Sequence, residues 1–265
     1  FIVPWHDKAL IGTTDTPIKM HSPEPKALEE EIEFILSTAA DYLMRPPTRN
    51  DVLSVFAGLR PLAAPDKETG STKEISRSHK IIVAGSGLIT ITGGKWTTFR
   101  KMAQDTVNKA IKIAGLPYLK CKTENLQIHG YQKIEKINND ILQIYGSDEI
   151  KIRDLITKNP ELGEPLFPQN IFIKAQVVWA VRQEMARTVE DVLARRLRVL
   201  FLDAKLAIEM APAVAKIMAA ELEKDIKWQE DQVSDFVDIA NFYLLKPYFP
   251  LWFQTTAHQI NSEKS

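Results

Sequence analysis

The sequence has little of three things, and each shortage excludes a class of protein. Its 265 residues include one cysteine, Cys121, so no internal disulfide forms and a reducing compartment is expected. No run of about 18 apolar residues is present, so we expect no helix that spans a membrane. Acidic and basic residues balance at 34 each, and without a basic excess we expect no nucleic-acid partner. The five histidines show no spacing typical of metal ligands, so we expect no metal site.

The chain also lacks an initiator methionine. It begins Phe1-Ile2-Val3-Pro4-Trp5, which is not a signal peptide and reads like the middle of a strand. We therefore expect a piece of a longer protein.

Hydrophobic periodicity divides the chain into two parts. In the first part we expect a helix between Pro23 and Pro46, and strands at 1–3, 9–13, 52–59, 75–84 and 88–92. After Gly93 and Gly94 the period changes from two to about 3.6, which predicts a helix from Trp96 to Ile113. Beyond residue 118 we expect helices at 131–145, 147–158, 174–187, 189–202, 204–221 and 231–245. The predicted fold class is α+β, with an antiparallel-sheet domain at 1–118 and an all-α domain at 119–265.

Three cations are expected at one edge of the first domain. If the strands at 52–59, 75–84 and 88–92 form an antiparallel meander, then Arg60, Arg77 and Lys95 lie side by side. Like charges repel, so such a cluster indicates an anionic ligand. A cation at a helix start, as at Lys95, is also unfavourable without an anion. Three solvated charges on loops remain the alternative.

The Gly93-Gly94 step predicts a ligand-binding helix start. Two glycines between a strand and a helix allow a ligand to approach the backbone closely. The first N–H groups of the helix also have no acceptor within the helix. Such a terminus binds phosphate or another electron-rich oxygen. The alternative is a sharp bend that requires positive φ angles.

Several segments resemble a known family. They are IGTTDT (11–16), AGLRPL (57–62), ISRSHK (75–80), GLITITGGKWTTFRKMAQDTV (87–107) and VVWAVRQEMARTVEDVLARRLRVLFLD (177–203). These segments are similar to the FAD-dependent, aerobic, quinone-linked glycerol-3-phosphate dehydrogenases, in particular to the C-terminal portion of those enzymes.

The resemblance implies a partial FAD and substrate domain followed by a helical domain. It also implies oxidation of sn-glycerol 3-phosphate to dihydroxyacetone phosphate by hydride transfer to FAD, with electrons passed to quinone. The implied catalytic residues are Arg60 and Lys95. The implied substrate-binding residues are Arg60, Arg77, Lys95 and His79, and the implied cofactor-binding residues are Gly93, Gly94, Lys95, Trp96 and Thr97. For His79, a hydrogen-bonded histidine in the sheet is the alternative.

The family's G-x-G-x-x-G fingerprint is absent from this sequence. We therefore expect the fragment to lack the N-terminal FAD domain, to lose FAD and to be inactive alone. The alternatives are a glycerol-3-phosphate oxidase that uses oxygen, and a non-catalytic helical module for docking or oligomerisation. The resemblance also implies a cytoplasmic location at the inner face of the cell membrane, with the membrane surface and a second copy of the chain as candidate partners.

The C-terminal part leaves two further questions open. Arg195 and Arg196 are either solvated or salt-bridged in a bundle, or part of an interface with the flavin domain or a second subunit, or they face acidic lipid headgroups. Six aromatic side chains fall between residues 242 and 253, where Pro247 and Pro250 interrupt any helix. They suit a strap packed on the bundle, which we favour, or a contact with a membrane interface.

Overall fold

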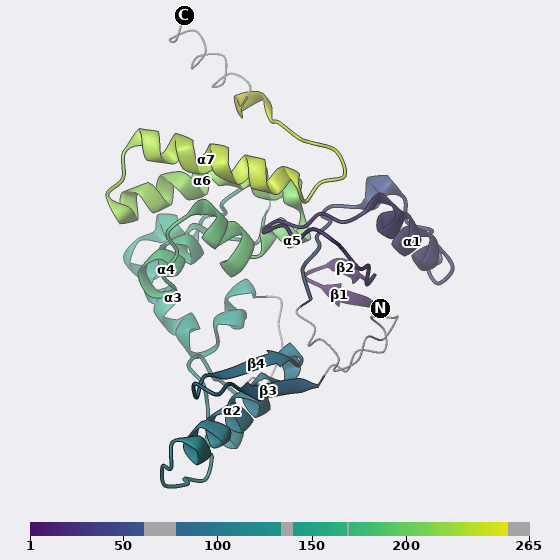
Figure 1. The fold of residues 1–265 in the computed structure, drawn as a ribbon. Coiled ribbons are helices and arrows are strands. Elements are labelled where there is room, and N and C mark those ends of the chain that lie inside the picture. The colour runs from purple at the N-terminus through teal and green to yellow at the C-terminus, as the bar shows by residue number, and fades with distance from the viewer. Residues whose placement is uncertain (61–77, 134–139, 169, 254–265) are drawn as a thin grey trace, which may run out of the picture. The chain divides into compact units, whose positions relative to one another are not determined.

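A computed structural model describes residues 1–60, 78–133, 140–168 and 170–253 (Figure 1). Its strands are β1 (Ile2–Trp5), β2 (Lys8–Ile11), β3 (His79–Val83) and β4 (Ile89–Gly93). Its α-helices are α1 (Glu29–Ala40), α2 (Phe99–Ile113), α3 (Glu149–Lys158), α4 (Lys174–Gln183), α5 (Val199–Leu202), α6 (Ala204–Leu222) and α7 (Ile226–Asn241). Antiparallel hairpins together with a majority of helices confirm the predicted α+β class.

The chain forms two compact units. The first, here called the helical unit, consists of Phe1–Asp15, Glu24–Ala57 and Gly130–Ser265. The second, the hairpin–helix unit, consists of Thr16–Pro23 and Gly58–His129. The expected domain boundary near residue 118 stays a prediction.

The hairpin of β1 and β2 forms where alternating apolar residues flank a two-residue turn. His6 and Asp7 both have positive φ angles, 46° and 60°. This conformation matches the right-handed twist of the strands, and it leaves Trp5 paired with Lys8. The hairpin expected around residues 5–8 is therefore confirmed.

The expected strand at 52–59 is wrong. Residues 52–60 are irregular, and Leu53, Ser54 and Val55 bond to other segments of the helical unit instead of to a sheet. The carbonyl of Leu53 accepts from the N–H of Ala204 at 3.1 Å, and the N–H of Val55 donates to the carbonyl of Tyr243 at 2.8 Å. The hydroxyl of Ser54 also donates to the carbonyl of Leu200, 146 residues away, at 2.8 Å. The described sheet that contains β3 and β4 therefore has two strands, and a three-stranded meander through 52–59 does not form.

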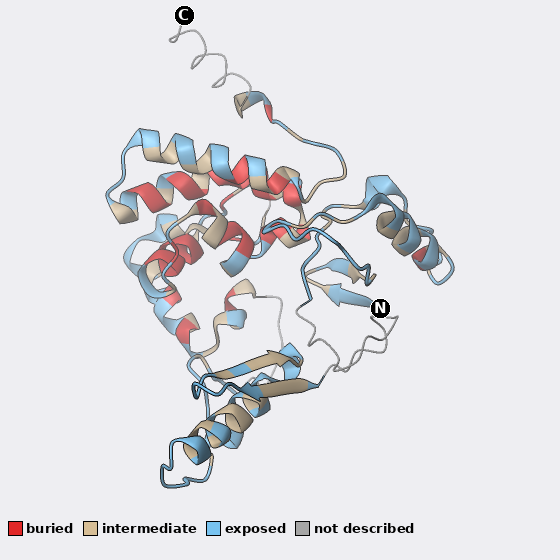
Figure 2. Cartoon of the chain, viewed as in Figure 1, coloured by how far each residue is buried: buried red, intermediate tan, exposed pale blue. Residues whose placement is uncertain are grey.

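The core lies in the helical unit, on α4, α5, α6 and α7 (Figure 2). Helices α6 and α7 pack along each other, and α4 packs against α6. The largest fully buried side chains include Ile152, Leu193, Leu200, Ile208, Met210, Met218 and Phe236. In contrast, no described residue of the hairpin–helix unit is buried.

Aspartates at the helix starts explain two of the observed boundaries. Asp203 accepts from the N–H of Leu206 at 2.9 Å and caps α6. Asp225 accepts from the N–H of Trp228 at 2.8 Å and caps α7, which therefore begins five residues before the expected 231.

The helix expected at 189–202 is interrupted. Residues Asp191–Arg196 form a π-helical turn, in which the N–H of Leu197 reaches back to the carbonyl of Val192. Arg198 then adopts a left-handed conformation with φ of 61°, and α5 starts at Val199. The single helix expected here is therefore replaced by a π-helical turn and the short helix α5.

The helix expected at 131–145 extends into 134–139, which lie outside the described residues. Ile141–Asp148 forms 3-10 turns, and Gly146 breaks their helical geometry with φ of 55°.

Residues 242–253 form a strap on the helical unit. Tyr243, Leu244, Tyr248, Trp252 and Phe253 are partly buried against its core. The strap interpretation is confirmed for these residues. Among the described residues, no helix has both the length and the apolar character needed to cross a bilayer.

Candidate active site

The β3–β4 hairpin and α2 bring one set of expected site residues together. Antiparallel pairing puts His79, the first residue of β3, opposite Gly93, the last residue of β4. The turn between the strands is closed by bonds between Ala84 and Leu88, at 2.9 Å, and between Gly87 and Ala84, at 2.9 Å. His79 is therefore held at the point where the chain leaves the sheet for α2.

The two glycines at this point are required by the backbone. Gly93 and Gly94 have φ angles of 73° and 81°, a region that other residues rarely adopt. A Cβ atom at Gly94 would also clash with Sδ of Met102 and lie 3.3 Å from Cβ of His79. The Gly94 backbone thus fits between a strand residue and a residue of α2.

Lys95 follows in an extended conformation and starts the helix. The 3-10 turn Trp96–Thr98 leads directly into α2. The Lys95 carbonyl accepts from the N–H and from the hydroxyl of Thr98, both at 3.0 Å. The N–H groups of Trp96 and Thr97 stand at a helix start, where no acceptor within the helix is available. Residues 95–97 are exposed, and N–H donors and a lysine at one helix terminus are the arrangement that can hold an anion or an electron-rich oxygen.

An exposed aromatic pair stands next to Lys95. Trp96 is 86% exposed and Phe99 is 58% exposed. Their rings stack with centroids 5.5 Å apart and an interplanar angle of 25°. These flat apolar surfaces and the adjacent N–H donors fit an aromatic ring system that carries carbonyl oxygens, such as a flavin. The residues at the helix start therefore fit the cofactor that the sequence implies.

Asp105 of α2 holds His79 in place. Its Oδ2 lies 3.2 Å from Nε2 of His79, and its Oδ1 accepts from Nζ of Lys101 at 2.8 Å. The hydrogen bond from Lys101, with a smaller contribution from His79, lowers the pKa of Asp105 below its usual value. Asp105 therefore remains ionised at neutral pH and acts as a hydrogen-bond acceptor. The expectation of a hydrogen-bonded sheet histidine is confirmed at position 79.

Of the two arginines in the expected cation cluster, the structure describes Arg60 but not Arg77. Arg77 lies outside the described residues. Arg60 is described and exposed, but it ends an irregular segment rather than a strand. The sheet that was expected to carry Arg60 to the edge beside Lys95 does not form, so the cluster of three cations stays a prediction.

Sequence reasoning missed Asp105 and Met102. Met102 and Asp105 are three residues apart on α2, and this spacing places them on one face of the helix. The spacing was visible in the sequence, but their partners His79 and Gly94 become apparent only when the hairpin packs on α2.

The arginines of the helical unit bond within that unit. Arg187 donates to the carbonyls of Val181 and Ala186 at 3.2 and 2.7 Å, near the end of α4. Arg195 pairs with Glu190 at 2.7 Å. Arg196 donates to the carbonyls of Asp191 and Glu184. These contacts favour the interpretation of salt-bridged or hydrogen-bonded bundle arginines.

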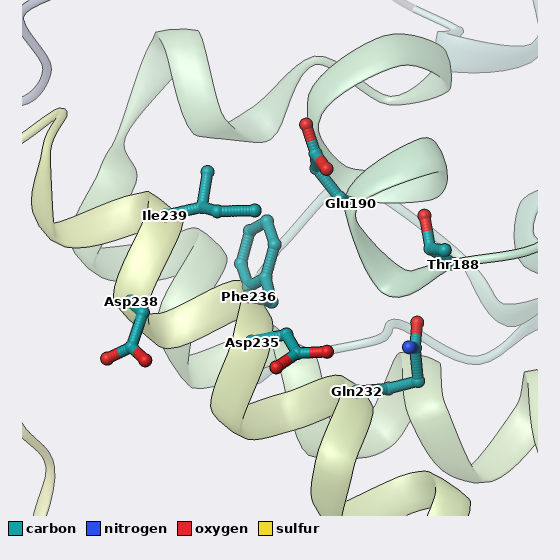
Figure 3. Close-up of a pocket in the computed structure, with 7 residues that line it drawn as sticks. All are labelled: Thr188, Glu190, Gln232, Asp235, Phe236, Asp238 and Ile239. Atoms are coloured by element: carbon teal, nitrogen blue, oxygen red, sulfur yellow. The ribbon is translucent and has the colours of Figure 1, made fainter. Parts of the chain in front are cut away.

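A separate surface pocket of about 350 Å³ lies between the π-helical region and α7 (Figure 3). It is lined by Thr188, Glu190, Gln232, Asp235, Phe236, Asp238 and Ile239. None of the site residues expected from the sequence lines it. No metal site is formed there or elsewhere in the described part of the chain, since no suitable group of three ligands converges.

Comparisons with known proteins identify the family. Residues 78–232 match the family model described as the C-terminal domain of alpha-glycerophosphate oxidase. The chain belongs to this family, and the resemblance seen in the sequence is confirmed.

Several curated relatives are mitochondrial glycerol-3-phosphate dehydrogenases, and two of them serve as examples. The protein from Saccharomyces cerevisiae is 32% identical over 285 residues, covering 89% of this chain and 44% of the relative. The protein from Rattus norvegicus is 33% identical over 282 residues, covering 98% of this chain and 37% of the relative. The chain thus spans less than half the length of these relatives.

A solved structure has a similar fold. The glycerol-3-phosphate dehydrogenase from Bacillus halodurans, complexed with FAD, matches with a TM-score of 0.73 and 25% identity. The match covers 94% of this chain and 52% of that chain.

Proposed function

We propose that this chain is part of an FAD-dependent dehydrogenase that oxidises sn-glycerol 3-phosphate to dihydroxyacetone phosphate. The observation that supports the proposal most is the helix start at Gly93–Thr97, where positive-φ glycines, a lysine and exposed N–H donors adjoin His79. The relatives named above support the choice of substrate and cofactor.

FAD, when bound, supplies the acceptor for the hydride that leaves the secondary alcohol of the substrate. The residues proposed to contact it are Gly93, Gly94, Lys95, Trp96 and Thr97. The backbone N–H groups of Trp96 and Thr97 and the positive end of the helix dipole favour negative charge on a bound ring carbonyl.

Arg60, Arg77 and Lys95 are proposed to bind the substrate, with Arg60 and Lys95 also near the reacting carbon. A phosphate dianion offers several acceptor oxygens, and each charge-assisted contact stabilises it by roughly 1.5–3 kcal/mol. His79 is proposed to line the same site. This role stands beside its hydrogen bond to Asp105, which occupies one of its two ring nitrogens.

The chain alone is proposed to be inactive and to lose FAD. It has no G-x-G-x-x-G fingerprint, and its curated relatives are more than twice as long as the region they share with it. An N-terminal FAD domain in the complete protein would supply the remaining cofactor contacts.

The electron acceptor is proposed to be a membrane quinone, with the protein bound peripherally to the membrane surface and a second copy as a candidate partner. The cytoplasmic face of the cell membrane stays a prediction, and the relatives' names offer the mitochondrion as the other candidate location. The family description, which names an oxidase, favours oxygen as the second candidate acceptor.

One experiment tests these proposals together. The full-length gene product is purified with FAD and assayed with glycerol 3-phosphate, using either a quinone analogue or oxygen as acceptor. Reduction of the quinone analogue supports the dehydrogenase, and peroxide formation supports the oxidase. Absence of turnover with both acceptors contradicts the proposed substrate. A stable flavin spectrum on the purified 265-residue chain contradicts the proposed loss of FAD.

A further inference from the structure

We propose that Asp105 is a positioning residue of this site, a role that rests on the proposed function. Asp105 fixes the His79 ring, and through it the Gly93–Gly94 backbone that leads to Lys95. The argument uses contacts within the hairpin–helix unit.

The first step concerns the proton on His79. An ionised carboxylate only accepts hydrogen bonds, and Asp105 is ionised at neutral pH, as an aspartate ordinarily is; the hydrogen bond from Lys101 lowers its pKa further. Nε2 of His79, at 3.2 Å from Oδ2, must therefore be the donor. In a neutral His79 this assigns the proton to Nε2 and leaves a lone pair on Nδ1. Asp105 thus selects both the tautomer and the orientation of the ring.

The second step connects His79 to the glycines. His79 pairs with Gly93 across the hairpin, and the position that a Cβ of Gly94 would take lies 3.3 Å from Cβ of His79. The same Cβ position would clash with the end of the Met102 side chain, and Met102 shares a face of α2 with Asp105. The Gly94 backbone therefore packs closely against both His79 of β3 and Met102 of α2.

The third step concerns what this unit lacks. Its described residues include no buried side chain, so packing alone fixes the hairpin on α2 weakly. The side chains of His79 and Asp105 are only 23% and 29% exposed, which shields their contact from water more than a surface pair. Because the site depends on the angle between β4 and α2, loosening this contact shifts the donors at residues 94–97. A shift of about 1 Å in a reacting group lowers turnover by up to 100-fold.

The test uses the full-length FAD-bound protein with Asp105→Asn. An amide either donates or accepts, so it no longer selects one tautomer of His79. We expect the flavin absorption spectrum and midpoint potential to change. We also expect kcat with glycerol 3-phosphate to fall about 10-fold while KM stays within about twofold. Asp105→Glu should recover kcat to within about threefold, because it keeps the carboxylate.

Two comparisons separate positioning from stability. Lys101→Ala removes the other contact of the same carboxylate and leaves the His79 contact, so it should change kcat less than about twofold. In a His79→Gln background, Asp105→Asn should have no further effect, because Asp105 acts through His79. An equal loss in both backgrounds overturns the proposal, and so does a spectrum and kcat equal to wild type.

Failure of the proposed function gives a different result. A wild-type protein that binds FAD but does not oxidise glycerol 3-phosphate contradicts the substrate, and the flavin spectrum of Asp105→Asn then still decides the positioning role. A wild-type protein that does not bind FAD contradicts both proposals.

Discussion

Glu209, in the second turn of α6, accepts a hydrogen bond from Nε1 of Trp252 at 3.0 Å. The same carboxylate accepts from the hydroxyl of Tyr248, and Nζ of Lys205 lies 4.4 Å from the centre of the Tyr248 ring. One acidic residue thus fixes two of the six aromatic residues of the strap, Tyr248 and Trp252, to the bundle.

Replacing Glu209 by alanine should loosen the strap. Two partly buried donors lose their acceptor, which lowers the free energy of unfolding by about 1–3 kcal/mol. Urea denaturation of the wild type and of Glu209→Ala measures the difference. Glu230→Ala, an exposed carboxylate on α7, serves as the control and should be close to neutral. Equal midpoints for all three proteins would contradict the role of Glu209.

Two tyrosines should make stability depend on alkaline pH. Burial raises the pKa of Tyr145 to about 12, and the bond to Glu209 raises the pKa of Tyr248 to about 12. Unfolded tyrosines lose their protons near pH 10. Between about pH 10 and pH 12 the folded state therefore holds more protons than the unfolded state, and the free energy of unfolding falls as pH rises. Below pH 10 this stabilisation is fully present.

Denaturation at pH 9 and pH 11.5 checks this dependence. Tyr248→Phe should make the loss of stability between the two pH values smaller, and Tyr118→Phe, which changes an exposed tyrosine, should leave it as in the wild type. An unchanged loss in Tyr248→Phe would rule out a contribution from that phenol.

Gly94→Ala should disturb the proposed active site. An alanine there keeps a φ near 81° at a cost of about 1–2 kcal/mol, and its Cβ displaces the end of the Met102 side chain. We expect weaker FAD binding by the full-length protein, measured by flavin release on dilution. Gly85→Ala is the matched control, because a Cβ at Gly85 meets nothing within 4 Å. Equal retention of FAD by both variants would contradict the tight fit at Gly94.

The exposed cations should affect catalytic efficiency. Arg60→Ala and Lys95→Ala are each expected to lower kcat/KM for glycerol 3-phosphate about 10- to 100-fold, because each removes a charge-assisted contact. Lys112→Ala, an exposed lysine in the last turn of α2, is the control. Loss of activity in the control alone, or in none of the three, would exclude the proposed substrate contacts.

The hairpins and most helices were predictable because their signals are local. The turn at 84–87, the diglycine step and the apolar period of α2 each depend on neighbouring residues only. The segment 52–59 was misread because alternating apolar residues suit a strand equally well as an extended segment on helices. Its true partners, Ala204 and Tyr243, are more than 140 residues away.

Two other features could not be predicted from one sequence: the π-helical turn of the helical unit and the packing of the candidate site. The π-helical turn at Asp191–Arg196 adds one residue to a helical repeat, and periodicity does not detect so small a change. The contact between His79 and Asp105 joins a strand to a helix, so it depends on packing. Residues 93–97 could be predicted from the motif, because the positive-φ glycines and the helix start lie next to each other in the sequence.

The bonds of residues 53–55 also determine when the helical unit can form. That unit is built from segments on both sides of residues 58–129, and its N-terminal part is bonded to α5, α6 and the strap. During synthesis, the bonds of residues 53–55 cannot all form until the chain as far as Tyr243 has left the ribosome. Contacts between such distant residues slow folding, because a large loop must close before they form. The polar groups of residues 53–55 therefore lack these partners until the C-terminal part of the chain has been synthesised.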